Sequence, residues 1–185
     1  IEGCTFAGNT TGTSGKGGAL YLHDSSIPIR DCTFTANSGG EGGAVAILSG
    51  SPTFTGCTFE DNLATNPGDG GAVYVEDSSA RFVECSFLRN QARLYGGALY
   101  SSGVVAHLER SYLYQNQAYE GGGVYGPWMI INSILTFNHA DIRGSAAYTT
   151  GAIRNSNLQQ APANAASLVV GASITNSVLL GEYPY

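Results

Sequence analysis

The sequence has little charge of either sign and no long apolar run. Lys and Arg total 8 and Asp and Glu total 14 among 185 residues, which gives a net charge of −6. Because no basic cluster is present, we expect no nucleic-acid partner. No apolar run approaches the roughly 18 residues of a membrane-spanning helix, so we expect no transmembrane segment in this chain.

The sequence also lacks the spacings that hold cofactors. No Cys-x-x-Cys or Cys/His pattern that would bind zinc occurs. Residues 12–18, GTSGKGG, resemble a phosphate-binding loop only superficially. Thr10 stands where that loop needs its first glycine, and Gly17 follows Lys16 where Ser or Thr is required. We therefore expect neither a metal nor a cofactor.

What the sequence does have is a repeat. Successive copies begin 21 to 28 residues apart, from the Ser156–Ser177 interval to the Cys4–Cys32 interval. Each copy has Cys or Ser at a position that we number zero, and most later reach a glycine step, typically Gly-Gly-Ala. The zero positions are Cys4, Cys32, Cys57, Cys85, Ser111, Ser133, Ser156 and Ser177. A repeat of this length indicates a solenoid, a propeller or an array.

Three positions of the repeat carry an apolar side chain. Two residues after zero stand Phe6, Phe34, Phe59, Phe87, Leu113, Leu135, Leu158 and Leu179. Three residues before zero stand Ile29, Phe54, Phe82, Leu108, Ile130, Ile153 and Ile174. After the glycines stand Leu20, Val45, Val73, Leu99, Val124, Ala147 and Leu168. Segments of fixed length joined by loops of variable length predict three short, half-buried strands per repeat.

The geometry that fits is an all-β fold, a parallel β-helix of about seven coils that forms a single domain over residues 1–185. Three short strands are too few for a propeller blade, and the consensus of a leucine-rich repeat is absent. Because the chain begins inside a coil, without Met and without a cap, we expect it to be a fragment of a longer protein.

The sequences FAGN, FTAN, FEDN and FLRN, paired with Gly-Gly-Ala and then Leu or Val, resemble the repeats of the polymorphic outer-membrane proteins first described in chlamydiae. The resemblance covers the first four coils well, the next three loosely and the last barely. It implies a right-handed β-helical passenger of an autotransporter, exposed on the cell surface and acting in adhesion.

Two further registers are interpreted as structural. The cysteines at position zero form one stack, in which parallel Cβ vectors suit a disulfide poorly, so we expect buried, reduced thiols. These are Cys4, Cys32, Cys57 and Cys85. An asparagine five residues after zero would bond to its backbone and to the next amide, coil by coil. These are Asn9, Asn37, Asn62, Asn90, Asn116 and Asn138.

Carboxylates decide whether the chain is an enzyme, because many β-helices cleave polysaccharides. Glycoside cleavage needs two carboxyl groups about 5 to 10 Å apart, which here means equivalent positions in neighbouring coils. At the repeat position of Asp61, the next coil has Arg89. Asp31 and Glu84 share a position, but the coil between them has Gly56 there. No pair converges, so we predict that the protein is not an enzyme; a carbohydrate-active enzyme remains the alternative.

One aromatic register is predicted to point outward. If the residues after the glycines point inward, alternation places the next residues outside. This row comprises Tyr21, Tyr74, Tyr100, Tyr125 and Tyr148, and Ala46 is its one gap. The row either stiffens the sheet by cross-strand pairing or contacts sugar rings or a partner protein.

We therefore predict an extracellular or cell-surface structural or adhesion module that binds a protein or a glycan through a lateral face. Two alternatives stay open, a carbohydrate-active enzyme and a subunit of an extracellular filament that self-associates through its coil ends.

Overall fold

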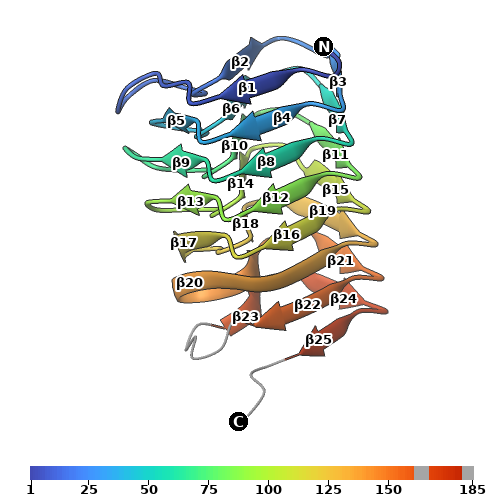
Figure 1. Cartoon of the computed structure of the whole chain (residues 1–185). Helices are drawn as coiled ribbons and strands as arrows, with labels where there is room; N and C mark the ends of the chain where they lie inside the picture. The colour runs from blue at the N-terminus through green and yellow to red at the C-terminus, as the bar shows by residue number, and fades with distance from the viewer. Residues whose placement is uncertain (161–166, 181–185) are drawn as a thin grey trace.

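The chain folds as a column of stacked coils, and every strand pairs in parallel with strands of the neighbouring coils. The computed structural model describes residues 1–160 and 167–180. Figure 1 shows the N-terminus and β1 at one end of the column and the last described strand, β25, at the other. The described residues contain no helix. The predicted all-β parallel solenoid is confirmed.

Two ladders of parallel strands bring the large apolar side chains into the interior. The front ladder, just after position zero, comprises β1 (Thr5–Ala7), β4 (Thr33–Thr35), β8 (Thr58–Glu60), β12 (Ser86–Leu88), β16 (Tyr112–Tyr114), the start of β20 (Ile134–Tyr148), β22 (Asn157–Gln160) and β25 (Val178–Leu180). The back ladder comprises β3 (Pro28–Arg30), β7 (Thr53–Thr55), β11 (Arg81–Val83), β15 (Ala106–Glu109), β19 (Trp128–Ile131), β21 (Ala152–Arg154) and β24 (Ser173–Thr175).

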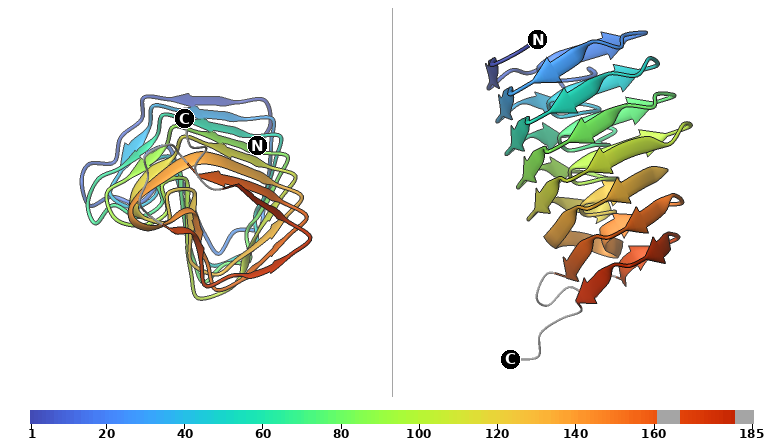
Figure 2. Two further views of the ribbon diagram at one scale, coloured as in Figure 1. Left: turned by 90° about the horizontal axis from the view of Figure 1, so that it is seen from below. Right: turned by 90° about the vertical axis from the view of Figure 1, so that its right-hand side faces the viewer.

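Two further ladders form the remaining side of the column. The tyrosine ladder, after the glycine step, comprises β2 (Leu20–His23), β6 (Val45–Leu48), β10 (Val73–Glu76), β14 (Leu99–Ser102), β18 (Val124–Tyr125), the end of β20 and β23 (Ser167–Val170). The fin ladder comprises β5 (Ser38–Gly39), β9 (Leu63–Ala64), β13 (Gln91–Ala92), β17 (Gln117–Glu120) and the middle of β20. Seen along the axis, the fin ladder and the glycine step project to one side as a fin (Figure 2).

The fin ladder corrects the prediction of three strands per coil, because the middle coils contain four. The fourth strand is only two residues long in β5, β9 and β13. Its inward position holds glycine or alanine, so it carries none of the large apolar residues that identify the other strands. The apolar register after the glycine step was predicted to continue from Ala147 to Leu168. In the structure, Ala147 pairs with Val169 instead. The pairing shifts within β20, between Arg143 and Ala147.

The interior contains two columns of aromatic rings, one from each of the front and back ladders. Phe59 stacks between Phe34 and Phe87, with ring centroids 4.8 and 4.7 Å away. Phe54 and Phe82 stack at 4.9 Å in the second column. All five side chains have 0 % exposure. The column therefore repeats the coil spacing of about 4.8 Å, which parallel strand pairing imposes.

Single residues with positive φ form two corners of each coil. One corner lies just before position zero, as at Asp31 (φ 50°) and Glu84 (φ 56°). The other lies four residues after zero, as at Asp61 (φ 54°) and Arg89 (φ 53°). Asp tolerates this region better than most residues because its short side chain bonds locally. The corners place charged side chains above one another on the outside.

The glycine step keeps the fin thin. Its second glycine packs against the backbone of the fin ladder in the next coil. A Cβ on Gly71 would lie 2.0 Å from the carbonyl oxygen of Gly97 and 2.6 Å from the backbone of Gln91. Gly43 makes the same approach to Leu63, also at 2.6 Å. Any larger residue would therefore separate the two layers of the fin.

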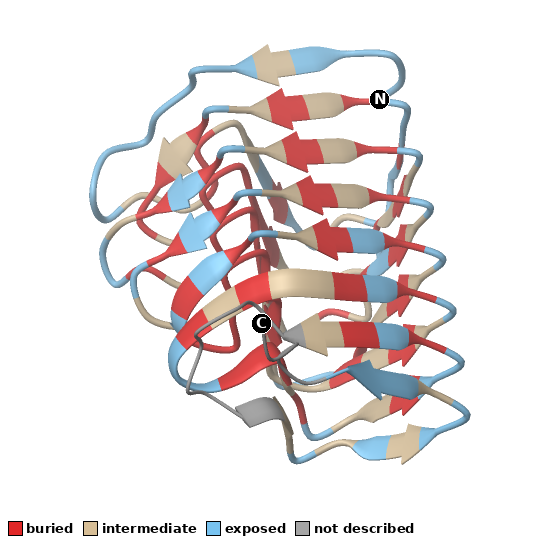
Figure 3. Cartoon of the chain, turned by 60° about the horizontal axis from the view of Figure 1, so that its bottom comes forward, coloured by how far each residue is buried: buried red, intermediate tan, exposed pale blue. Residues whose placement is uncertain are grey.

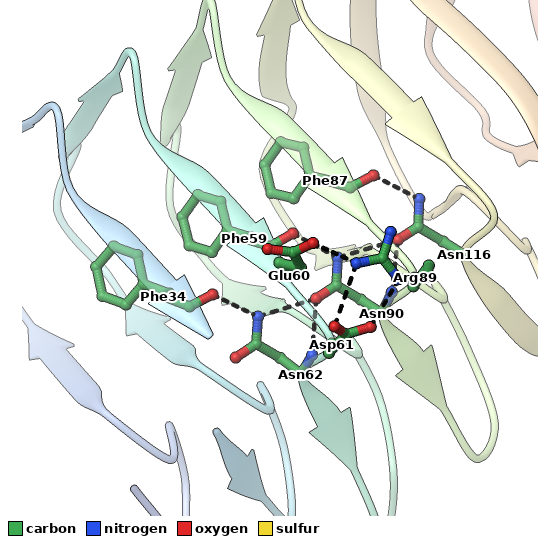
Figure 4. A network of polar contacts seen from close by, with 9 residues as sticks. All are labelled: Phe34, Phe59, Glu60, Asp61, Asn62, Phe87, Arg89, Asn90 and Asn116. Atoms are coloured by element: carbon green, nitrogen blue, oxygen red, sulfur yellow. Dashed lines mark hydrogen bonds and ion pairs between the residues drawn. The ribbon is translucent and has the colours of Figure 1, made fainter. Parts of the chain in front are cut away.

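The asparagine register forms a continuous amide ladder. From Asn9 to Asn116, each Nδ2 donates to the Oδ1 of the asparagine in the next coil, at 2.8 to 3.0 Å, and the ladder ends at Asn138. The same group also donates to a carbonyl of the front ladder, as Asn62 does to Phe34 (Figure 4). The Oδ1 of Asn90 accepts a second bond from the backbone N–H of Asn62. The buried amides are thus satisfied within the fold.

The cysteines are free, but their predicted burial is wrong for one of the four. Cys32, Cys57 and Cys85 are buried, whereas Cys4 is exposed. Cys4 belongs to the first coil, which no other described coil covers on its outer side; Asn9 is exposed there for the same reason. Figure 3 shows this coil mostly in the colours of exposed and intermediate residues, whereas the middle coils are buried along their inner side.

Candidate functional site

The tyrosine row lies on the outward side of the tyrosine ladder, but it is not a row of five. Tyr74, Tyr100, Tyr125 and Tyr148 stack continuously, with ring centroids 5.1, 5.8 and 4.7 Å apart and planes within 9°. Ala46 pairs with both Tyr21 and Tyr74 and separates them. Tyr21 is 48 % exposed and stacks instead on His23. The continuous stack therefore has four tyrosines.

The ring faces of this stack are largely occupied. Each inner ring covers the faces of its two neighbours, and Tyr95 packs at 4.5 Å from Tyr125 and 6.5 Å from Tyr100. Tyr74 is only 6 % exposed, which corrects the expectation that the whole row is open. The stack therefore presents ring edges and phenol hydroxyls to a partner, and not the broad faces on which sugars stack.

Cations close both ends of the stack. The Lys16 ammonium lies 4.5 Å from the centre of the Tyr74 ring, and the Arg143 guanidinium lies 4.9 Å from that of Tyr148. Lys16 comes from the first coil and reaches across Ala46 to the third. The small side chain at position 46 thus leaves room for a cation where the row lacks a tyrosine. Such contacts are attractive because the ring face is electronegative.

A second register borders the tyrosines, and the sequence analysis missed it. It consists of the residue immediately before each glycine step, and we call it the border row. Its members are Lys16, Glu41, Asp69, Tyr95, Glu120 and Arg143. Backbone bonds keep it in register, since the N–H of Gly42 donates to the carbonyl of Asp69 and that of Gly70 to Tyr95. Counting back one residue from each glycine step would have found it.

The border row assembles the charged groups of this face. Lys16 pairs with Glu41 and lies 3.5 Å from Glu76, whose carboxylate accepts a hydrogen bond from the Tyr74 hydroxyl at 3.2 Å. Arg143 pairs with Glu120 at 3.2 Å. The expectation that no carboxylates converge is therefore wrong, because Glu41 and Asp69 occupy equivalent positions in adjacent coils. We call this border row together with the four stacked tyrosines the tyrosine face.

Asp69 is the most perturbed carboxyl group of this face. Burial raises the pKa of Asp69 to about 6, and the neighbouring charge of Glu41 adds to the effect. Its Oδ1 atom is buried without a hydrogen-bond partner among the described residues. Because burial penalises the ionised form, Asp69 holds its proton at a pH where an ordinary aspartate has lost it. A carboxyl of this kind can donate or accept a proton near neutral pH.

The phenols and the lysine respond to the same surroundings. Burial, followed by the charges of Glu41 and Glu76, raises the pKa of Tyr74 far above its usual range. Burial also raises the pKa of Tyr100 and of Tyr125. For Lys16, burial lowers the pKa, but the hydrogen bond and the charge of Glu41 outweigh it and the net pKa is raised. These three phenols therefore stay protonated as hydrogen-bond donors, and Lys16 stays charged.

The carboxylates that the sequence analysis did weigh are paired elsewhere. Arg89 donates to Asp61 at 3.0 and 3.2 Å and also contacts Glu60 (Figure 4). Arg110 donates to Glu84 at 2.9 Å. These are exposed pairs between corners of adjacent coils, so they are expected to contribute little to stability. None of them faces the tyrosines.

Among the described residues, no group of three or more His, Cys, Asp or Glu side chains could hold a metal ion. No helix in that part of the chain is long and apolar enough to cross a membrane.

A family model described as a right handed beta helix region matches residues 1–178. The chain belongs to the right-handed β-helix family. No curated protein matches it. The family assignment confirms the handedness that the repeat resemblance implies. It does not extend to the polymorphic outer-membrane protein repeats themselves.

The right-handed β-helix has a second lateral feature, a groove of about 350 Å³ on the outer side of the fin. Its floor runs over Ala64, Ala92 and Ala118, whose side chains are buried. One aliphatic side chain, Leu63, and six polar or aromatic ones line it on either side: Thr65, Gln91, Arg93, Gln117, Tyr119 and Asp141. The sequence analysis missed this groove because the strand that carries it has no apolar signature.

Proposed function

We propose that this right-handed β-helix is an extracellular or cell-surface module that binds an extended glycan along its tyrosine face. One observation carries the proposal. Four phenols recur coil by coil along the axis, in register and on one side, and three carboxyl groups of the border row, Glu41, Asp69 and Glu120, stand in the register beside them. Strand pairing spaces such groups about 4.8 Å apart, which favours a ligand that is itself long and repetitive.

Hydrogen bonding is the means of recognition on this face. A protonated phenol donates one bond and accepts others, and an ionised carboxylate accepts several, so the pair matches sugar hydroxyls in both directions. Glu41 and Glu76 lie close enough to Tyr100, and Glu120 close enough to Tyr125, for their charges to help raise the pKa of each phenol. These carboxylates also hold Lys16, Arg143 and the Tyr74 hydroxyl in place, and an oxygen that is ion-paired can still accept a further hydrogen bond. The location at the cell surface is part of the proposal. It is supported by the resemblance of the FxxN and Gly-Gly-Ala repeats to those of surface-exposed bacterial proteins.

The test is a variant that removes hydroxyls and keeps rings. Tyr100→Phe combined with Tyr125→Phe preserves the stacking of the row, so circular dichroism and urea unfolding should be unchanged. Binding of the parent to a panel of immobilised polysaccharides, neutral and acidic, should fall by about tenfold in the double variant, since two hydrogen bonds of roughly 0.5 to 1.5 kcal/mol each are lost. Tyr112→Phe combined with Tyr114→Phe on the front ladder serves as the matched control.

The proposal fails on either of two outcomes. One is a parent protein that binds no polysaccharide of the panel. The other is a double variant that binds as the parent does, which would leave the stacked tyrosines a purely structural feature.

A glycoside-cleaving enzyme is the second candidate, and one observation favours it. Asp69, with its raised pKa, stands one coil from Glu41, which is ion-paired with Lys16. A carboxyl with a raised pKa beside a second carboxyl group is the arrangement that glycosidases use for acid and nucleophile or base. Reducing-end release from the same polysaccharides decides between the candidates. Cleavage by the parent that is lost in Asp69→Asn and in Glu41→Gln would establish the enzyme, whereas release equal to that of a buffer blank excludes it for the panel.

A further inference from the structure

The fin groove has a narrow floor of alanines. The side chains just before and just after these alanines extend outward on the same face of the fin. Gln91 and Gln117 precede the floor alanines, and Arg93 and Tyr119 follow them, each in equivalent positions of neighbouring coils. Residues two apart on a strand share a face, so the two registers form opposite walls. The groove therefore runs along the axis of the column, parallel to the tyrosine face but on the fin.

The polar groups of these walls are uncommitted. Within residues 1–160 and 167–180, the side chains of Gln91, Gln117 and Tyr119 make no hydrogen bond and Arg93 makes no ion pair. All four are exposed. This distinguishes them from the corner charges, such as Arg89 and Arg110, which are paired with carboxylates of adjacent coils. Donors and acceptors with free capacity are the groups that can bind a ligand without first breaking a bond.

Tyr119 differs from the stacked tyrosines in that its ring face is accessible, and a ring face is what a sugar packs against. It is 45 % exposed, and it stacks on no other aromatic ring of the described residues. Its ring face is therefore free, while the faces of Tyr100 and Tyr125 are covered by their neighbours. An electronegative ring face attracts the weakly positive C–H groups of a pyranose.

The charge of the groove indicates the kind of sugar. Arg93 and Asp141 contribute one charge of each sign, and Asp141 also contacts His139 at 3.2 Å. The remaining polar groups are two amides, a phenol and the hydroxyl of Thr65. Amides donate and accept at once, as sugar hydroxyls do. No excess of positive charge is present to hold a polyanion.

We infer that the fin groove is a binding site for a neutral polysaccharide chain, with Tyr119 stacked on one pyranose ring and Gln91 and Gln117 bonded to its hydroxyls. A volume of about 350 Å³ lies at the lower end of ligand pockets and holds a short segment of such a chain. The inference rests on the proposed function in giving this chain a binding role, and it assigns a second site with its own ligand class.

The experiment titrates the chain with cellohexaose, laminarihexaose and xylohexaose, and with hexagalacturonate as the charged comparison, by isothermal titration calorimetry. At least one neutral hexasaccharide binds the parent. Tyr119→Ala weakens that binding about tenfold, as expected for loss of an aromatic contact of roughly 1.5 kcal/mol. Gln117→Ala weakens it about threefold. Tyr112→Ala, which removes a tyrosine exposed on the front ladder, leaves it unchanged.

Several results overturn the inference. They are the absence of binding to every neutral hexasaccharide, tighter binding of hexagalacturonate, or equal affinities for Tyr119→Ala and Tyr112→Ala. The double variant Tyr100→Phe with Tyr125→Phe separates the two sites. If it abolishes hexasaccharide binding while Tyr119→Ala does not, the fin inference fails and the tyrosine face stands. If the reverse holds, the fin groove stands and the tyrosine face fails.

Discussion

An inner column of aromatic rings on the front ladder and an outer column on the tyrosine ladder run along this β-helix, and they are built alike. The inner rings of Phe34, Phe59 and Phe87 stack with centroids 4.7 to 4.8 Å apart. The outer rings, represented by Tyr100 and Tyr125, stack at 4.7 to 5.8 Å. Both spacings follow from the pairing of parallel strands, so the geometry alone does not tell a structural column from a functional one.

What separates the two columns is their surroundings. The inner rings are fully buried among apolar side chains. The outer rings have hydroxyls beside carboxylates, and Lys16 and Arg143 close the two ends of their stack. Removing an inner ring should therefore cost stability. Changing the polar edge of an outer ring should cost binding and leave stability nearly unchanged.

The largest expected effect is on the inner column. Phe59→Ala removes a ring that contacts rings above and below and leaves a cavity, so the free energy of unfolding should fall by about 3 to 5 kcal/mol. Urea unfolding followed by circular dichroism measures it. Phe59→Leu is the matched control, because later coils carry Leu in this register and its cost should be near 1 kcal/mol. Equal, small losses for both variants would contradict the buried column.

The amide ladder should give the next largest effect. Asn90→Ala leaves the N–H of Asn62 and the carbonyl of Phe59 without their partners in a buried site. Unsatisfied buried groups cost roughly 1 to 3 kcal/mol each, so we expect a loss of about 3 kcal/mol in urea unfolding. The same change at the exposed end, Asn9→Ala, should cost less than about 1 kcal/mol. A ladder that contributes nothing would give two similar, small values.

The outer column should respond less. Tyr100→Ala removes a half-exposed ring from a stacked row and should cost about 1 kcal/mol of unfolding free energy. Tyr100→Phe keeps the ring and should cost almost nothing. If Tyr100→Ala lowers the free energy of unfolding by several kcal/mol, the outer column is as important for stability as the inner one, and the distinction between them is wrong.

The smallest expected effect depends on pH. Since the folded protein holds the pKa of Asp69 near 6, above its ordinary value, the stability that this group contributes is complete at low pH. It is lost as the pH rises from about 4 through 6, because the unfolded chain ionises first. Asp69→Asn does not titrate and should be more stable than the parent by up to about 1 kcal/mol at pH 8, after solvent screening.

Thermal unfolding of the parent and of Asp69→Asn across this pH range checks the prediction. The two proteins should have similar stability at pH 3 and diverge above pH 4. A difference that is constant with pH would mean that Asp69 titrates normally.

Much of the fold could be predicted because one apolar residue per strand recurs in three registers. Strand pairing confirms Phe59 opposite Phe34 and Phe87, and Phe54 opposite Ile29 and Phe82. The fin strand could not be predicted this way, because alanine and glycine in its inward position carry no apolar signal. For the last coil, the pairing shift within β20 moves the register to Val169.

The tyrosine face was predicted in part. Alternation along the strand correctly places Tyr100 and Tyr125 outside, but it does not indicate that rings in adjacent coils cover one another. The border row could not be recognised from the sequence because its members differ in type. Glu41, Asp69 and Arg143 share a position of the repeat but not a chemistry. Only the fold of the fin brings that position beside the tyrosines.

Hydroxyl-radical footprinting of the parent protein, alone and with the polysaccharide that it binds best, tests the account most directly because it reports on each tyrosine separately. The account predicts protection of Tyr100, Tyr125 and Tyr148 by the bound polymer, with no change at Tyr112 and Tyr114 on the front ladder. Unchanged oxidation along the tyrosine row while the polymer is bound would contradict it.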